Sequence, residues 1–139
     1  MLGGLYTLDD GAHSYWLKGG QFPAKPHGLI NLVHYEDAAI AFLKCLENPD
    51  KIGGEVFLVS DGAPMSRQEI VDADPEQDLF VGKGEAVIFT GGEEVDGKKY
   101  KSQKIRNMLG WEPSYKSLAD FYENWMIYPS LSYECQLYT

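Results

Sequence analysis

The chain has 139 residues, with 12 Lys and Arg against 21 Asp and Glu and a formal net charge of −9. This length fits one domain with a buried core, and the acidic balance argues against a nucleic-acid surface, which needs clustered basic residues. No apolar run approaches the roughly 20 residues that a membrane-spanning helix needs, so no membrane span is expected. Cys45 and Cys135 fit neither a zinc-site nor a Cys-x-x-Cys pattern.

The first part of the chain is expected to contain one strand and one short helix. Residues Leu2–Tyr6 are short and apolar, which favours a strand. His13–Leu17 is predicted as a short helix. The glycines and prolines of Lys18–Gly28 then predict a loop.

A strand, helix, strand, helix order follows. Leu29–Val33 is a short apolar run typical of a buried strand, and Tyr35–Leu46 has helical periodicity that stops before Pro49. Val56–Val59 is a second apolar run, predicted as a strand, and Asp61-Gly62 supplies a turn after it. This alternation indicates an α/β protein with a parallel sheet.

The next helix is predicted to begin at Ser66. Ser66 forms a capping box with Glu69, and Pro75 cuts the helix short. Glu85–Thr90 has the β-branched and aromatic content of a strand.

Two further helices are predicted near the C-terminus. Ser102 is expected to cap the first, which runs to Leu109 and ends at Gly110. Ser117 begins the second, Leu118–Trp125, with another capping arrangement.

Four sequence segments, taken together and in chain order, indicate a family resemblance that no single segment would establish. They are Asn31-Leu-Val-His-Tyr-Glu-Asp-Ala-Ala39, Gly54-Glu-Val-Phe-Leu-Val-Ser-Asp-Gly62, Ser66-Arg-Gln-Glu69 and Lys104-Ile-Arg-Asn-Met-Leu-Gly-Trp-Glu-Pro113. Over roughly residues 2 to 125, this set resembles the NAD-dependent epimerase/dehydratase family of extended short-chain dehydrogenase/reductases. Asp96-Gly-Lys-Lys-Tyr100 adds a similarity to plastid members of plants and algae, and only this similarity suggests a plastid location.

The resemblance implies where the chain lies within the family fold. Residues 1–125 would be the C-terminal part of a Rossmann-type parallel sheet, about two strands, with a small α+β substrate-domain region. The chain is expected to begin near the strand that follows the family's catalytic helix, because it is shorter than a complete enzyme of this type. The tail, residues 126–139, resembles nothing in the family and its role is open.

Two signatures of the family are missing. No Gly-x-x-Gly-x-x-Gly turn opens a helix, although such a turn holds the dinucleotide in complete members. The catalytic spacing Tyr-x-x-x-Lys occurs only at Tyr100 and Lys104, which straddle the expected helix start at Ser102, so we interpret the match as accidental. We therefore assign no catalytic residue and expect no cofactor for this chain alone, whereas the complete family fold would bind NAD or NADP.

Five residues are candidates for a site. The resemblance implies that Leu5 and Tyr6 pass the nicotinamide in a complete enzyme, so a cofactor contact there would depend on a partner. His34 could act as a general acid or base, but ordering the strand-to-helix junction is the favoured interpretation. His13 and Arg67 could line a substrate cleft with His34, although solvent-facing positions are favoured for both.

Three more residues have mainly structural interpretations. Glu36 and Asp37 could bind a metal, but acidic residues in a first helical turn also interact favourably with the helix dipole, and no metal site is predicted. Trp111, beside a helix end, is expected to pack in the core.

Three functions stay open from the sequence. The favoured hypothesis is a truncated relative that is non-catalytic by itself and acts as an accessory or structural subunit of a larger assembly. The alternative is the substrate-binding half of an NAD(P)-dependent oxidoreductase or epimerase, completed by a separate or missing N-terminal Rossmann part. The third is a fragment with no function of its own. Expected partners are an N-terminal Rossmann fragment, a large protein complex, or a second copy through self-association, because incomplete sheets expose edges and apolar surface.

Overall fold

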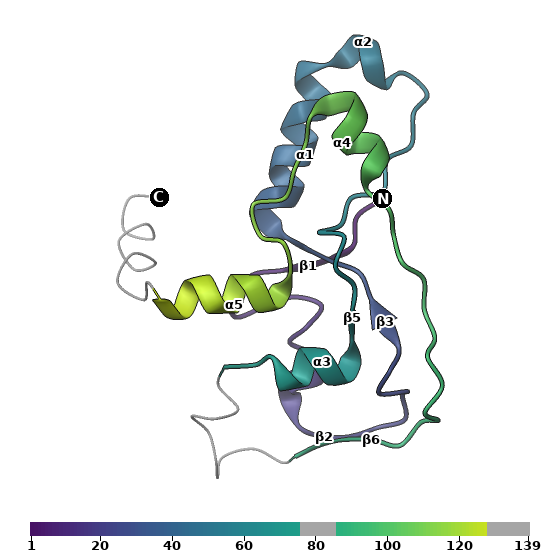
Figure 1. Cartoon of the computed structure of the whole chain (residues 1–139), viewed down its shortest axis with the longest axis vertical. Coiled ribbons are helices and arrows are strands. Elements are labelled where there is room, and N and C mark those ends of the chain that lie inside the picture. The colour runs from purple at the N-terminus through teal and green to yellow at the C-terminus, as the bar shows by residue number, and fades with distance from the viewer. Residues whose placement is uncertain (76–85, 128–139) are drawn as a thin grey trace.

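The computed structural model describes residues 1–75 and 86–127 and shows an α/β protein with short parallel strands (Figure 1). Within this described part the strands form three two-stranded sheets. The pairs are β1 (Gly4–Tyr6) with β4 (Leu32–His34), parallel; β2 (Gly20–Phe22) with β6 (Val87–Phe89), parallel; and β3 (Leu29–Ile30) with β5 (Met65–Ser66), antiparallel. The α/β class with parallel strands, predicted from the sequence, is confirmed.

The helices gather in two places. Their bounds are η1 (Trp16–Lys18, a 3₁₀ turn), α1 (Tyr35–Glu47), α2 (Pro49–Ile52), α3 (Arg67–Asp72), α4 (Gln103–Leu109) and α5 (Leu118–Ile127). Figure 1 shows α1, α2 and α4 together at one end of the molecule, with α3, β2 and β6 at the other end. The parallel pair β1–β4 lies between these ends, and α1 follows β4 directly.

Helix α1 confirms the strand-to-helix junction expected at His34. The Nδ1 atom of His34 accepts the backbone N–H of Glu36 at 3.3 Å, which satisfies one of the free donors at the helix start. At the other end, the Asn48 side chain donates to the Lys44 carbonyl at 2.8 Å. Pro49 then begins α2, where its missing N–H costs nothing.

The strand predicted over Leu29–Val33 is wrong in one respect, because the structure has two strands there. β3 and β4 break at Asn31 and pair with different partners. At the break, the Asn31 side chain accepts the Tyr100 N–H at 2.7 Å and donates to the Lys98 carbonyl. Asn31 therefore holds an extended segment, 98–100, instead of continuing one strand.

The strand predicted over Val56–Val59 is not formed. Within the described residues, this segment makes a single isolated parallel bridge, between Val59 and Leu2. The Gly3 N–H donates to the Val59 carbonyl at 2.8 Å, and the Val59 N–H donates to the Met1 carbonyl at 2.9 Å. The contact is confined to Val59 within this segment, and Val56 stays 70% exposed.

The region before β3 also differs from its prediction. A strand, β2, forms inside the predicted loop Lys18–Gly28, and the predicted helix His13–Leu17 is reduced to the 3₁₀ turn at Trp16–Lys18. Aromatic packing gives the reason, because Phe22 on β2 lies 6.1 Å from Phe89 on β6 and 5.5 Å from Trp16 between ring centroids. The partner strand is 65 residues away in sequence, so local composition does not reveal it.

The helix caps predicted at Ser66 and Gly110 are confirmed, whereas the one at Ser102 is confirmed in position only. Ser66 and Glu69 form the reciprocal capping box that the sequence predicts. Gly110 ends α4 in the left-handed conformation, with φ of 63°. Ser102 is the N-cap residue of α4, as predicted, but its side chain makes no capping hydrogen bond. The Ser102 hydroxyl instead accepts the buried Ser60 N–H at 2.8 Å and donates to the Ser60 carbonyl at 2.9 Å.

Helix α5 begins as predicted and runs slightly further. The Ser117 hydroxyl accepts the Asp120 N–H at 3.0 Å, and the Asp120 carboxylate accepts the Lys116 N–H at 2.9 Å. The helix continues to Ile127 rather than ending at Trp125. The predicted tail comprises residues 126–139; its first two residues belong to α5, and residues 128–139 lie outside the described part of the chain.

Two clusters of buried apolar side chains hold these elements together. One lies between α1, α4 and the Val59 segment and comprises Val33, Ala38, Ala41, Val59, Ile105, Leu109 and Trp111. The other joins β1 and β4 to α3 and α5 and comprises Tyr6, Leu32, Ile70, Leu118, Phe121 and Tyr122. The core position predicted for Trp111 is confirmed, since its side chain is fully buried.

Candidate functional site

Three of the predicted site residues meet in a buried aromatic cluster, called here the His-Tyr cluster. Tyr6 ends β1 and His34 ends β4, so the parallel pairing brings their rings to 5.2 Å between centroids. The His13 ring lies 5.9 Å from Tyr6. The rings of Tyr115 and Phe121 lie 4.5 Å and 4.8 Å from the His34 ring, both in tilted arrangements.

Burial disfavours the charged forms of the His-Tyr cluster, which comprises Tyr6, His13 and His34. Tyr6, His13 and His34 are all buried, and burial lowers the pKa of both histidines and raises the pKa of Tyr6. Among the described residues, neither the Tyr6 hydroxyl nor His13 Nδ1 finds a hydrogen-bond partner. The solvent-facing position favoured for His13 is wrong, because this residue is only 1% exposed. The cluster is a packing centre at the carboxyl ends of two strands, and the substrate-cleft roles of His13 and His34 stay predictions.

The cofactor contact expected at Leu5 and Tyr6 would also involve side chains that are buried or half-buried. Leu5 is half-buried against the cluster under α1, and Tyr6 is fully buried. The described α-helices begin after His34, Asn48, Ser66, Ser102 and Ser117, so none of them opens at a glycine-rich turn. The cofactor contact at Leu5 and Tyr6 therefore stays a prediction that depends on a partner.

Asp37 has a structural role that the sequence did not reveal. Its carboxylate is fully buried and accepts the backbone N–H groups of Ser114 at 2.7 Å and Tyr115 at 3.1 Å. The Trp111 indole N–H donates to the Asp37 carbonyl at 2.9 Å. Asp37 thus fastens the first turn of α1 to the 111–115 loop, which in turn places Tyr115 against His34. The helix dipole is a smaller part of its role.

Asp61 is a second buried carboxyl group that sequence reasoning missed. It follows the Val59 bridge, and its Oδ1 accepts the Ala63 N–H at 2.8 Å across a turn at Gly62, whose φ is 86°. Burial raises the pKa of Asp61 to about 7, and the other carboxyl oxygen has no partner among the described residues. The signal in the sequence is an apolar run followed by Asp61-Gly62, although this pair by itself predicts only a turn.

Arg67 lies apart from the His-Tyr cluster. Its guanidinium stacks over the Trp16 ring at 5.1 Å, donates to the Lys25 carbonyl at 3.0 Å and lies 3.6 Å from Asp96. The guanidinium is packed closely over Gly28, where an added Cβ would overlap it. Arg67 therefore fastens the loop before β3 to α3, and its substrate-cleft role stays a prediction.

Tyr100 and Lys104 lie on either side of the start of α4, as the sequence predicts. Tyr100 precedes α4 and is bound through its backbone to Asn31, whereas Lys104 lies in the first turn of α4. Lys104 forms an ion pair with Glu55 and lies 5.5 Å from the Phe57 ring centroid. The two side chains thus have separate surroundings.

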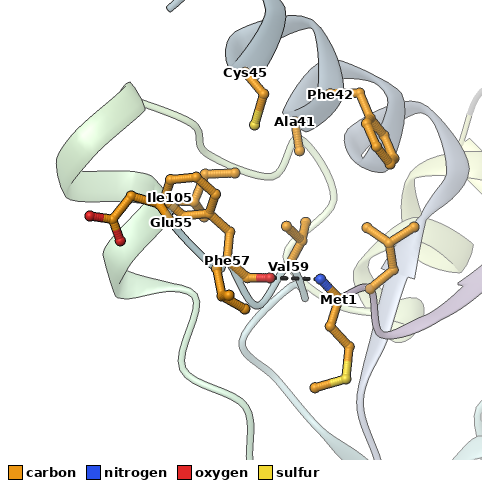
Figure 2. A pocket seen from close by; sticks show the side chains of 10 residues that line it. Met1, Ala41, Phe42, Cys45, Glu55, Phe57, Val59 and Ile105 are labelled. Atoms are coloured by element: carbon orange, nitrogen blue, oxygen red, sulfur yellow. Dashed lines mark hydrogen bonds between the residues drawn. The ribbon is translucent and has the colours of Figure 1, made fainter. Parts of the chain in front are cut away.

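The surface of the described residues has several hollows, of which two border predicted or conspicuous residues. An apolar cavity of about 280 Å³ lies between α1, α4 and segment 55–59. Figure 2 shows that α1 lines one side of it with Ala41, Phe42 and Cys45. The other side is lined by Met1, Phe57 and Val59. A more polar hollow of about 350 Å³ lies beside the start of β1, where Gly3, Gly4, Asn31, Lys98 and Tyr100 are among its lining residues. Over the described residues there is no helix suited to span a membrane and no group of three potential metal ligands.

Comparison with known proteins shows that this chain is similar to solved structures in its fold. No protein-family profile matches the sequence, and no curated protein sequence is significantly similar. Solved structures do match. They include UDP-glucose 4-epimerase of Thermotoga maritima, bound to UDP-glucose (15% identity, TM-score 0.61), and UDP-N-acetylglucosamine 4-epimerase of Bacillus cereus (12%, 0.62). A third is the enzyme WbmG of Bordetella bronchiseptica in complex with NAD (16%, 0.59).

These neighbours are enzymes of the NAD-dependent epimerase/dehydratase type, and the chain resembles part of their Rossmann-type fold. The matches cover 86%, 90% and 91% of this chain but only 41%, 46% and 41% of the Thermotoga, Bacillus and Bordetella chains. The chain therefore spans less than half of the length of the structures that it matches.

Proposed function

We propose that this chain is the C-terminal part of a short-chain dehydrogenase/reductase of the NAD-dependent epimerase/dehydratase family, and that by itself it is a non-catalytic, accessory or structural unit of a larger assembly. The coverage of the matches carries this proposal, since most of this chain corresponds to less than half of each enzyme. The enclosed His-Tyr cluster supports it, because its ionisable rings are packed as core.

A second function is the substrate-binding half of an NAD(P)-dependent enzyme, completed by an N-terminal Rossmann part. The polar hollow beside Gly3 and Gly4 favours this alternative, because Lys98 and Tyr100 bring polar groups to a glycine-lined surface. Two structural neighbours are described with UDP-glucose or NAD bound, so a nucleotide sugar is the substrate class to test.

Calorimetric titration of the purified chain separates these functions. We expect no binding of NAD(H) or NADP(H) at micromolar concentration, because the glycine-rich turn whose backbone amides hold the pyrophosphate is missing. Absence of UDP-glucose binding would favour the non-catalytic unit, whereas UDP-glucose binding that is weakened by Lys98→Ala but not by Lys51→Ala would favour the substrate-binding half. Micromolar binding of a dinucleotide to this chain alone would contradict both.

A further inference from the structure

Helix α1 is apolar on two adjacent flanks, only one of which is covered. The covered flank includes Ala38, Ala41 and Cys45, which pack against the Trp111 and Ile105 cluster. The other flank, called here the bare flank, comprises Tyr35, Ala39, Phe42, Leu43 and Leu46. Its four large side chains are between 55% and 74% exposed. A helix that is apolar around this much of its surface is typically covered on both sides.

The spacing of the bare flank matches a helix–helix seam. Tyr35, Ala39, Phe42 and Leu46 follow one another at intervals of four, three and four residues, which is the spacing of side chains that interdigitate between two packed helices. The pattern is also self-complementary. With two copies antiparallel, Tyr35 would lie against the second copy's Leu46, and the small Ala39 would receive the second copy's Phe42.

The exposed area is sufficient for a stable contact. Phe42 also lines the apolar cavity with Met1 and Val56, which are 67% and 70% exposed, so the apolar surface continues beyond the helix. At roughly 200 Å² for a large side chain, these six exposed residues present on the order of 700 Å². A standard interface buries about 800 Å² on each partner, and monomers rarely expose an apolar patch of this size.

We propose that the bare flank binds the same flank of a second copy of this chain, forming a twofold dimer through antiparallel α1 helices. The antiparallel arrangement places the N-terminus of each α1 beside the C-terminus of the other, which is favourable for the helix dipoles. This inference does not rest on the proposed function, because it uses only the surface of the isolated chain. Since each copy carries a charge of −9, the dimer should tighten as salt screens the repulsion.

Sedimentation equilibrium of the purified chain tests the dimer. We expect a monomer–dimer equilibrium at micromolar concentration, and Phe42→Asp should weaken it at least about 30-fold, as loss of a central aromatic contact does. Leu46→Lys is a second variant, chosen because a cation in the last turn favours the helix. Val95→Asp is the matched control, since Val95 is 70% exposed in the segment before α4, outside the bare flank. Circular dichroism checks that each variant is folded.

Cysteine cross-linking tests the orientation, in a background with Cys45→Ala and Cys135→Ala. A mixture of the Tyr35→Cys and Leu46→Cys variants should form a disulfide, whereas neither variant alone should, because like positions would be about 16 Å apart along the antiparallel helices. A monomer at about 100 μM, open-ended association, or a dimer unaffected by Phe42→Asp and Leu46→Lys would overturn the proposal. A dimer weakened equally by Val95→Asp, or cross-linking by either cysteine variant alone, would also overturn it.

Discussion

Replacing Asp37 by Asn tests whether a buried carboxylate fastens α1 to the loop before α5. In the structure its two oxygens accept the Ser114 and Tyr115 N–H groups at 2.7 and 3.1 Å. An Asn side chain keeps one acceptor but turns an NH₂ group toward the other backbone N–H. One bond to a charged group is lost and one buried donor is left unpaired, so we expect the free energy of unfolding to fall by about 2–4 kcal/mol.

Glu36→Gln is the matched control, because Glu36 lies in the same first turn of α1 but is exposed. If both acidic residues acted only through the helix dipole, each substitution would cost about 0.3–1 kcal/mol. Urea unfolding followed by far-UV circular dichroism measures both values, and an unchanged m-value shows that the same transition is compared. If Asp37→Asn and Glu36→Gln lower the free energy of unfolding by amounts that agree within about 0.5 kcal/mol, Asp37 does not fasten α1 to the 111–115 loop.

The remaining predictions concern buried polar groups. The pKa of Asp61 rises from 3.8 to about 7 on folding, so its contribution to the free energy of unfolding falls as pH rises between these values. Asp61→Asn should flatten this fall and should be more stable than the parent at about pH 8. Equal stability of the two proteins at that pH would contradict the shift. His34→Gln should cost about 1–3 kcal/mol through loss of the cap and ring packing. Because burial lowers the pKa of His34 below 6.5, His34→Gln should also lose less stability than the parent as pH falls below about 6.5. If the variant melts normally but the complete assembly loses activity by orders of magnitude, the structural role assigned to His34 would be reversed. Ser102→Ala should cost about 1–3 kcal/mol by leaving the Ser60 N–H unpaired, measured by thermal unfolding, and no change in melting temperature would contradict the buried network.

The sequence alone determined the features that depend on neighbouring residues. The periodicity of Tyr35–Leu46, the capping box at Ser66 and the left-handed end at Gly110 are each set within a few residues, and each is confirmed. The family resemblance also anticipated the Rossmann-type fold of the structural neighbours. Local backbone preferences and short-range hydrogen bonds are enough to specify such features.

Only the tertiary structure decided which distant groups meet. β2 forms because a strand 65 residues away supplies its partner, whereas among the described residues Val56–Val59 makes only an isolated bridge to Leu2. Asp37 is a clamp rather than a dipole partner because two N–H groups more than 70 residues away reach its carboxylate. These outcomes depend on long-range pairing and burial, which hydrophobic pattern and local propensity do not encode.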